Sequence, residues 1–530
     1  MTNENRASSA RPRWVAIVLA AALLLGLVAR LSLALRPPAE LTPVCLADDA
    51  FYYLRIAEHI LAGDGPTFDG RTATNGYHPL WMGVSLLAVF ITKSATAGAS
   101  VLLLLLALIG TANAYLLGHI AAKTLGETAG MVATIFWSLN PLVYFTELMG
   151  VEAPLMTLLV FAATLVYLPL READDAPLSR WLVWGVLIGL ALLARTDAIL
   201  FCAPLAVDAL IVCRKRLPKA LAAAGAAAAT TLPWILYNLL TFGTVAQDSL
   251  RVLLLRQRAF QAATGEDLGS FLWRQLQTGF GDYLLRYVGL SSMYLAYGLP
   301  VLALGMLVAA RLTGGKPLWT ERTRALIHLL IWGAAAWLFY SLYFWDRKNW
   351  YFLPVLTALG LFFALAVAHL ERVTQARRAG AVLLIAAGAL IVAGYAAQAK
   401  NLAAHGYHPW QAAYLEAAQA VRELHAQEPA ARIGAMNSGI ISAFSGVDVV
   451  NLDGVVNPEI RRAMERKELP AYLERERIGY VVDHLELIGA YEIFADDAWK
   501  RSFKLVRRFQ TSSFAGDVVL MKYEPPEETP

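Results

Sequence analysis

Residues 48–60 read DDAFYYLRIAEHI, and residues 75–81 read NGYHPLW. This polar and aromatic segment follows one hydrophobic run and precedes a chain that is mostly hydrophobic. Two adjacent acids, Asp48 and Asp49, open it. Acidic groups are costly to hold at a membrane, and ionisable residues there usually serve a function. We therefore expect the chemistry of the protein to lie in this segment.

The composition indicates that the surroundings of this segment are a membrane. The chain has 530 residues, of which 58% are hydrophobic and 16% are charged. Soluble proteins are about 45–50% apolar and about 25% charged. The net charge of +4 is too small to indicate a nucleic-acid partner. The three cysteines have neither disulfide nor metal-ligand spacing. We expect a polytopic α-helical membrane protein that uses no organic cofactor and binds no nucleic acid.

Hydrophobic runs predict about eleven transmembrane helices, because one span needs about 20 apolar residues. The predicted spans are residues 14–35, 98–122, 129–146, 153–170, 181–194, 198–213, 219–240, 287–310, 325–344, 351–370 and 379–397. The apolar run 79–92 is short, and a proline opens it. It is therefore ambiguous by length alone.

The placement of Lys and Arg resolves this ambiguity. Basic clusters occur before the first span and at residues 214–219, 311–324 and 372–378. All of them face the cytoplasm only if residues 79–92 do not cross the membrane. We predict a juxtamembrane helix at 79–92, a cytoplasmic N-terminus and an extracytoplasmic C-terminus in a bacterial plasma membrane. No cleavage site follows the first run, so we expect no cleavable signal peptide.

The composition becomes that of a soluble protein near residue 398. We expect residues 1–397 to form a transmembrane catalytic module with an outer loop at 36–97. Residues 398–530 are expected to form an extracytoplasmic α/β domain. It should contain an amphipathic helix at 410–426 and a parallel or mixed sheet. The predicted strands are residues 432–436, 447–452, 479–482, 505–509 and 518–523.

Acids in two loops predict the reaction centre. Asp48 and Asp49 have two interpretations, a helix N-cap or a general base that deprotonates an acceptor hydroxyl. Burial beside Tyr52 would raise the pKa of such a base. Glu152 reaches the same side between two spans, although an acid before Ala-Pro also begins many helices. Asp49 and Glu152 together can bind a divalent cation such as Mg²⁺, Mn²⁺ or Ca²⁺.

Basic residues near the same face are candidates to bind a phosphate, because Arg and Lys suit charge-assisted hydrogen bonds. They are Arg195, Arg251, Arg256, Arg347 and Lys348. Arg195 has a second interpretation as a local partner of Asp197, which is itself a candidate for substrate binding. Arg347 and Lys348 have a second interpretation as interfacial side chains.

Three further side chains are candidates to contact a sugar: Tyr52, His78 and Trp350. For His78 the alternative is a packing or hydrogen-bonding residue beside Pro79. For Trp350 the alternative is the aromatic belt of a membrane protein.

In its motifs the chain resembles the GT-C superfamily of membrane glycosyltransferases, which take sugar from a polyprenyl-phosphate donor. Within it, the chain is most similar to bacterial aminoarabinose transferases and mycobacterial arabinofuranosyltransferases. The matching motifs are DDAFY at 48–52, GVEAP at 150–154, LARTD at 193–197, Pro233-Trp234 through Asn238 to Phe242-Gly243, NWYFLP at 349–354, NSG at 437–439 and VNLDG at 450–454. Their order follows the predicted topology.

The resemblance implies that the first-loop aspartate, Asp48 or Asp49, is the catalytic base. It implies that Glu152 helps to hold a metal or substrate. The implied function is inverting transfer of one sugar from a polyprenyl monophosphate to a cell-envelope glycan, lipid or protein. Alternatives are a transporter or flippase of lipid-linked saccharides, an oligosaccharide ligase and a non-catalytic scaffold. Transporters usually show repeated halves, and no repeat is visible in this sequence.

Overall fold

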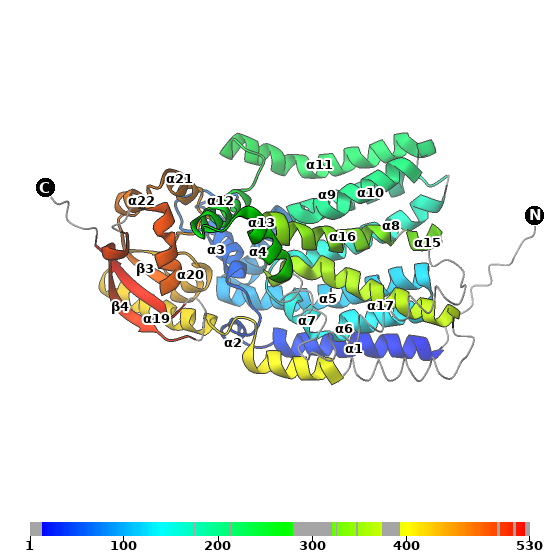
Figure 1. Cartoon of the computed structure of the whole chain (residues 1–530), viewed down its shortest axis with the longest axis horizontal. Helices are drawn as coiled ribbons and strands as arrows, with labels where there is room; N and C mark the ends of the chain where they lie inside the picture. The colour runs from blue at the N-terminus through cyan, green and yellow to red at the C-terminus, as the bar shows by residue number, and fades with distance from the viewer. Residues whose placement is uncertain are drawn as a thin grey trace, which may run out of the picture.

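The computed structural model describes residues 13–173, 175–212, 214–278, 321–324, 326–345, 348–373, 393–495, 499–511 and 516–524. It consists of a long helical bundle with a small sheet at one end (Figure 1). The start of the first helix lies at the opposite end of the molecule from this sheet. The expected division at residue 397 remains a prediction. We use "C-terminal α/β unit" for the described part of residues 398–530.

The bundle helices run along the longest axis of the molecule (Figure 1). They are α1 (Arg13–Ala34), α5 (Ala95–Leu125), α6 (Glu127–Leu139), α8 (Ala153–Glu172), α9 (Leu178–Ala194), α10 (Ile199–Val212), α11 (Leu217–Phe242), α16 (Ile327–Leu338) and α17 (Leu353–Val373). Short helical segments accompany them: α7 (Pro141–Glu147), η1 (Thr196–Ala198), η2 (Arg214–Arg216), α15 (Glu321–Arg324), η4 (Phe339–Phe344) and η5 (Asn349–Phe352).

Within the described residues, six helical stretches are long and apolar enough to cross a membrane. A bent pair, α6 with α7, makes a possible seventh. The expected multi-pass helical architecture is therefore confirmed. The number of eleven spans remains a prediction, because residues 287–310 and most of 379–397 lie outside the described part of the chain.

The span predicted at 129–146 consists of two helices, α6 and α7, with a bend between them. The chain bends by 59° between α6 and α7. Asn140 ends α6, and its side chain accepts a hydrogen bond from Leu142 N at the start of α7. Pro141 follows at the first position of α7, where its missing N–H costs nothing. The Asn-Pro pair is thus a helix start inside an apolar run.

A buried ion pair fixes this bend against α1. Arg30 donates to Glu147 Oε2 at 2.6 and 2.9 Å, and both side chains are fully buried. The same guanidinium donates to the backbone oxygens of Trp137 and Ser138 near the end of α6. The network ties α1 to both halves of the broken helix, just before the chain reaches Glu152.

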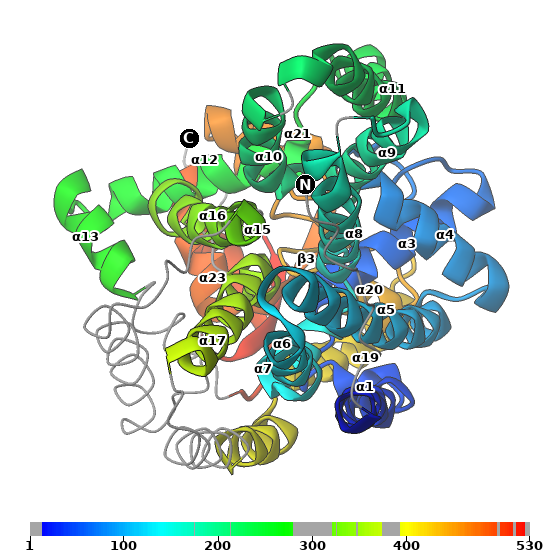
Figure 2. The ribbon, with the colours of Figure 1, turned by 90° about the vertical axis from the view of Figure 1, so that its right-hand side faces the viewer.

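Residues 79–92, where a juxtamembrane helix is predicted, form the helix α4 (Pro79–Thr92). Its position relative to the membrane remains a prediction. Its 14 residues span about 21 Å, less than the roughly 30 Å of a bilayer core. It packs on α3 (Asp48–Ala62) at the end of the bundle that carries the C-terminal α/β unit (Figures 1 and 2). The short α2 (Pro38–Leu41) precedes them.

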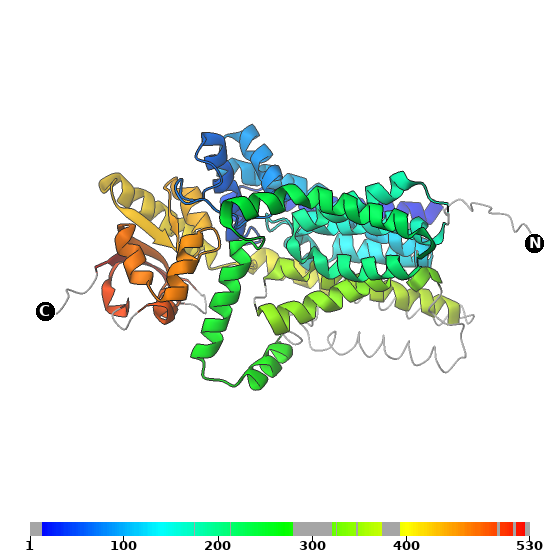
Figure 3. The ribbon, with the colours of Figure 1, turned by 90° about the horizontal axis from the view of Figure 1, so that it is seen from above.

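Two helices leave the bundle after α11. Figure 3 shows α12 (Asp248–Ala263) running across the bundle axis, with α13 (Leu268–Thr278) beyond it. The amino-terminal part of α12 therefore lies beside α3 and the C-terminal α/β unit, so that it can contribute to a site between them.

The C-terminal α/β unit holds a five-stranded sheet of order β2-β1-β3-β5-β4. Its strands are β1 (Arg432–Ala435), β2 (Val450–Asn451), β3 (Ile478–His484), β4 (Phe503–Phe509) and β5 (Val518–Tyr523). Strands β2, β1 and β3 are parallel, and β5 and β4 continue the sheet antiparallel. The five predicted strands are all present, and the sheet is mixed.

The helices of this unit are α19 (Gln411–Gln427), α20 (Gly439–Ser445), α21 (Pro458–Arg466), α22 (Leu469–Arg475) and α23 (Leu485–Ala490), with the 3₁₀ turns η6 (Tyr491–Phe494) and η7 (Trp499–Ser502). The predicted helix at 410–426 corresponds to α19. Residues 406–408 pass along residues 43 and 44, where Gly406 lies too close to Pro43 O for any side chain. The unit is thus seated on the chain just before α3.

Candidate functional site

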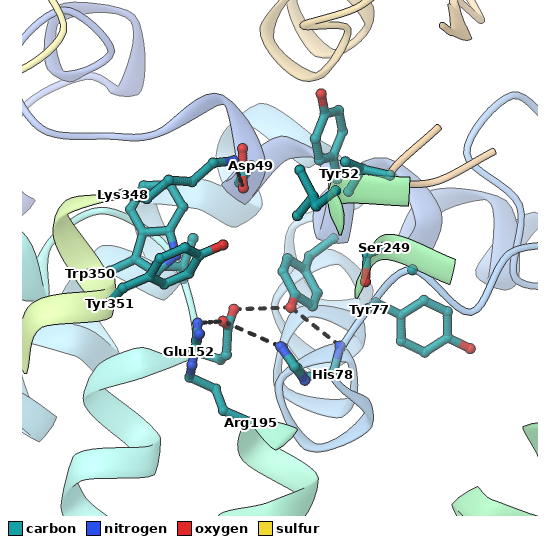
Figure 4. A pocket seen from close by; sticks show the side chains of 15 residues that line it. Asp49, Tyr52, Tyr77, His78, Glu152, Arg195, Ser249, Lys348, Trp350 and Tyr351 are labelled. Carbon is teal, nitrogen blue, oxygen red and sulfur yellow. Dashed lines mark hydrogen bonds and ion pairs between the residues drawn. The ribbon is translucent and has the colours of Figure 1, made fainter. Parts of the chain in front are cut away.

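A pocket lies where the bundle meets the C-terminal α/β unit (Figure 4). It holds about 580 Å³ of space free of atoms, part of which is open to solvent. It is lined by Asp49, Tyr52, Tyr53, Gly76, Tyr77, His78, Val151, Glu152, Arg195, Ser249, Leu253, Lys348, Trp350, Tyr351 and Val455. The lining comes from six separate segments before residue 398 and from one loop of the C-terminal α/β unit.

Asp49 and Lys348 form an ion pair at one side of the pocket (Figure 4). Lys348 Nζ lies 2.9 Å from Asp49 Oδ2, and the two side chains remain 29% and 27% exposed. The ammonium group also lies 5.3 Å from the ring centre of Trp350. Asp49 is in the first turn of α3, so its direction is set by the placement of that helix. Because both side chains are partly exposed, each can contact a ligand without a change in the fold.

Glu152 is the centre of the second charged group. Its Oε1 accepts a hydrogen bond from Arg195 at 2.5 Å, and its Oε2 accepts one from the Tyr53 hydroxyl at 2.9 Å. Arg195 also donates to both oxygens of Asp197 at 2.9 Å and to the Tyr340 hydroxyl at 3.1 Å. Its guanidinium lies 4.9 Å from the ring centre of Tyr351. Glu152 and Arg195 are thereby held in fixed orientations.

His78 lies beside Glu152 (Figure 4). Its Nε2 is 3.7 Å from Glu152 Oε1, and its backbone N–H donates to the Tyr53 hydroxyl at 3.3 Å. Burial lowers the pKa of His78, and the nearby Glu152 carboxylate only partly offsets this. The imidazole is therefore neutral near pH 7. Gln247 fixes the loop by donating to Tyr77 O at 2.5 Å.

Asp48 faces away from this pocket. Its carboxylate accepts hydrogen bonds from Ile440 N at 2.6 Å and Gly439 N at 3.2 Å, at the start of α20. Burial raises its pKa to about 7, although both backbone N–H groups favour the charged form. Of the two adjacent acids, Asp49 lines the pocket and Asp48 contacts the C-terminal α/β unit.

The structure brings together most of the residues chosen from the sequence. Asp49, Tyr52, His78, Glu152, Arg195, Lys348 and Trp350 all line the pocket. Asp197 stands behind it, paired with Arg195 as the local interpretation predicts. Arg251 does not line the pocket and pairs with Asp248 at 3.3 Å, and Arg256 pairs with Asp453 at 3.2 Å. Arg347 lies outside the described residues.

Comparison with known proteins shows that the chain has a known fold. Residues 78–237 match the family described as dolichyl-phosphate-mannose-protein mannosyltransferase, and residues 401–522 match a domain of unknown function (DUF8728). No match was found among curated proteins. The structure of ArnT from Cupriavidus metallidurans in the apo state is similar with a TM-score of 0.55 at 15% identity, covering 96% of this chain and 98% of that chain.

Two structures of the Archaeoglobus fulgidus oligosaccharyltransferase are also similar. The complex with Zn and sulfate has a TM-score of 0.53 at 15% identity, covering 96% of this chain and 73% of that chain. The complex with an inhibitory peptide and a dolichol-phosphate has a TM-score of 0.53 at 14% identity, covering 98% and 75%. These likenesses show the fold, and the match over residues 78–237 agrees with it. The family match and the shared fold together indicate a GT-C type glycosyltransferase.

The glycosyltransferase pocket offers a poor donor set for a divalent metal. Asp49 and Glu152 both line it, as expected for a shared ligand. However, Lys348 pairs with Asp49, and both oxygens of Glu152 accept hydrogen bonds from Arg195 and Tyr53. Across the described part of the chain, no group of three or more His, Cys, Asp or Glu side chains is arranged to hold a metal ion. The residues present at Asp49 and Glu152 therefore do not fit the expected divalent metal.

Some lining residues were not chosen from the sequence. Tyr53 could have been chosen, because it stands four positions after Asp49 and so lies on the same face of α3. Trp350 and Tyr351 are buried beside the pocket and do not form an exposed aromatic belt. Ser249 and Val455 carry no local signal, since they reach the pocket only when α12 and the C-terminal α/β unit fold against α3.

Proposed function

We propose that this glycosyltransferase moves a single sugar from a polyprenyl-monophosphate donor to an acceptor hydroxyl outside the cytoplasm of a bacterial cell. The acceptor class is a cell-envelope glycan, lipid or protein. The observation that carries the proposal is the Asp49–Lys348 pair, which presents a carboxylate and a cation side by side in the pocket. The pocket end of the bundle is then extracytoplasmic, and the N-terminus is cytoplasmic.

Asp49 is the proposed general base. The acceptor oxygen attacks the anomeric carbon, and the bond between that carbon and the donor phosphate oxygen breaks. The acceptor proton passes to the Asp49 carboxylate, and the polyprenyl phosphate leaves with the electron pair. A single displacement of this kind inverts the anomeric centre and needs no second, nucleophilic carboxylate. Asp49 is preferred to Asp48 as the base, because both carboxylate oxygens of Asp48 already accept hydrogen bonds from Gly439 N and Ile440 N.

Lys348 is the proposed phosphate ligand. Its compact ammonium can leave Asp49 and approach a phosphate oxygen, where it stabilises the charge that develops on the leaving group. Arg195 is a weaker candidate for direct contact, because each of its three nitrogens already donates to a protein group. Its proposed role is to hold Glu152 at the pocket wall.

The balance of charge in the pocket favours a monophosphate donor. Two carboxylates, Asp49 and Glu152, face two cations, Lys348 and Arg195, and His78 is neutral. A phosphodiester brings one negative charge, whereas a pyrophosphate diester brings two. Among the lining residues no third Lys or Arg is present to pair with the second charge, and leaving a partly buried charge unpaired is costly. The charge balance therefore favours the proposed donor over the pyrophosphate-linked donors of an oligosaccharide ligase.

The test is to incubate the purified protein with a panel of polyprenyl-phosphate sugars and candidate acceptors, and to detect released polyprenyl phosphate by mass spectrometry. Asp49→Asn should abolish release, whereas the adjacent Asp48→Asn should retain measurable release. Pyrophosphate-linked oligosaccharides serve as the competing donor class. Full turnover in Asp49→Asn, or release from pyrophosphate donors alone, would overturn the assignment.

A further inference from the structure

The C-terminal α/β unit directs its strand ends toward the pocket. Its parallel strands β2, β1 and β3 end at one edge. The NSG motif joins β1 to α20, and the VNLDG motif comprises β2 and the first three residues of the loop after it. Ligands of open α/β sheets usually occupy the crevice at this edge. In this chain the first turn of α3 occupies it, because Asp48 binds the turn formed by residues 436–440.

Two side chains of α3 hold that turn. Asp48 accepts hydrogen bonds from Gly439 N at 3.2 Å and Ile440 N at 2.6 Å. The Tyr52 hydroxyl, one helical turn later, donates to Met436 O at 3.3 Å and accepts from Ser438 N at 3.4 Å. These contacts fix both the position and the rotation of the helix start.

The approach is too close for any residue but glycine at position 439. A Cβ added to Gly439 would lie 2.4 Å from the backbone oxygen of Asp48 and 3.1 Å from its Oδ1. Real side chains do not tolerate the first distance, so α3 or the turn would have to move. The next residue along α3 is Asp49, which would move with it.

Asn451 links the turn to the pocket wall. Its amide nitrogen donates to Met436 O at 3.3 Å and to Ser438 Oγ at 3.1 Å. Its amide oxygen accepts from Gly454 N at 2.9 Å. The following residue, Val455, lines the pocket. One buried side chain therefore connects the turn that supports α3 to the loop that carries a lining residue of the pocket.

We propose that the C-terminal α/β unit is a working part of the transferase site, in which residues 436–440 and Asn451 position α3 so that Asp49 faces the substrate. This inference rests on the proposed function, in which Asp49 is the base. It assigns Asp48, Gly439 and Asn451 as positioning residues, which act on the reaction only through Asp49. Such placement is valuable, since an error of about 1 Å can lower turnover about 100-fold.

The test compares two glycine-to-alanine variants of the full-length protein. Gly439→Ala inserts a methyl group against Asp48. The matched control is Gly479→Ala in β3, where an added Cβ meets no atom within 4 Å. We expect Gly439→Ala to lower kcat about 100-fold while the donor KM stays unchanged, because the donor is held by other residues. Gly479→Ala should match the wild type in both.

Hydrogen–deuterium exchange of the α3 peptide supplies a readout that does not depend on activity. It should become faster in Gly439→Ala and remain unchanged in Gly479→Ala, with the melting temperature of both variants measured alongside. If Gly439→Ala does not fold, Asn451→Asp replaces it. That substitution keeps the oxygen that binds Gly454 N and removes the donor to Met436 O.

The outcomes separate this inference from the proposed function. Unchanged exchange in α3, unchanged kcat, or an equal loss in Gly479→Ala would overturn the positioning role. If the wild type releases no lipid phosphate from any donor, the proposed function fails. The exchange experiment then still decides whether residues 436–440 hold α3.

Discussion

Lys348 Nζ lies 2.9 Å from Asp49 Oδ2, so that the proposed base and the proposed phosphate ligand neutralise each other before any donor binds. While Asp49 Oδ2 accepts the hydrogen bond from Lys348, that oxygen is not open to an acceptor hydroxyl. A donor phosphate that draws Lys348 away would therefore bind the cation and release the base in one event. This exchange of partners would couple proton removal to the presence of the donor.

Lys348→Met should weaken donor binding and lower turnover together. Loss of one charge-assisted hydrogen bond costs about 1.5–3 kcal/mol, which is roughly a 10- to 150-fold rise in the donor KM. Lys348→Arg should recover part of the loss, because it restores the charge with a different shape. The control is Lys500→Met, an exposed lysine of the C-terminal α/β unit paired with Glu492. A donor KM that does not change in Lys348→Met would contradict the phosphate role.

Asp48 should make stability depend on pH. Burial raises its pKa from 3.8 to about 7. Between these values the folded protein keeps a proton that the unfolded chain releases, so this contribution to stability is full at low pH and is lost as the pH rises through 7. Asp48→Asn removes the titration. The melting temperature of the wild type relative to Asp48→Asn should fall from about pH 5 to about pH 8, and parallel curves would count against it.

The sequence was sufficient to choose the charged residues that line the pocket, but not the apolar residue Val455 that lines it with them. Asp49, Glu152, Arg195 and Lys348 could be chosen because ionisable residues at a membrane face stand out against apolar runs. Val455 could not, since a valine in a soluble segment has no feature that marks it. The choice between Asp48 and Asp49 also needed the structure, because the two acids are separated by tertiary contacts, with Gly439 and Ile440 for Asp48 and with Lys348 for Asp49.

The same contrast holds for the fold. Run length predicted α1, α5, α8 and α11 within a few residues, because an apolar helix must match the membrane. It missed the bend at Asn140, where hydropathy continues and only the side-chain cap and Pro141 break the helix. Local hydrogen bonding decided the structure there, and a sliding average of hydropathy does not contain it.

Tyr53→Phe should destabilise the pocket without removing a charge. The Tyr53 hydroxyl donates to Glu152 Oε2 at 2.9 Å, and its loss leaves that buried oxygen without this donor. We expect the free energy of unfolding to fall by about 1–3 kcal/mol. Tyr480→Phe is the matched control, since its hydroxyl donates to Glu428, which is exposed to solvent, and it should cost much less. Chemical denaturation in detergent measures both, and equal losses would show that Glu152 does not depend on Tyr53.

Glu147→Gln should be the most destabilising of these substitutions, although it lies outside the pocket. Glu147 and Arg30 are fully buried, and Glu147 Oε1 also accepts hydrogen bonds from Trp137 and Asn113. Removing one partner leaves a buried charge uncompensated, at a cost of about 3–5 kcal/mol. The double substitution Arg30→Met with Glu147→Leu should recover much of this loss, since an apolar pair of similar volume often replaces a buried ion pair well.

The control is Arg36→Met, which breaks the exposed pair with Glu40 and should cost about 1 kcal/mol or less. Thermal unfolding of the three variants ranks them, and a double variant no more stable than Glu147→Gln would mean that the bend between α6 and α7 needs the charges themselves.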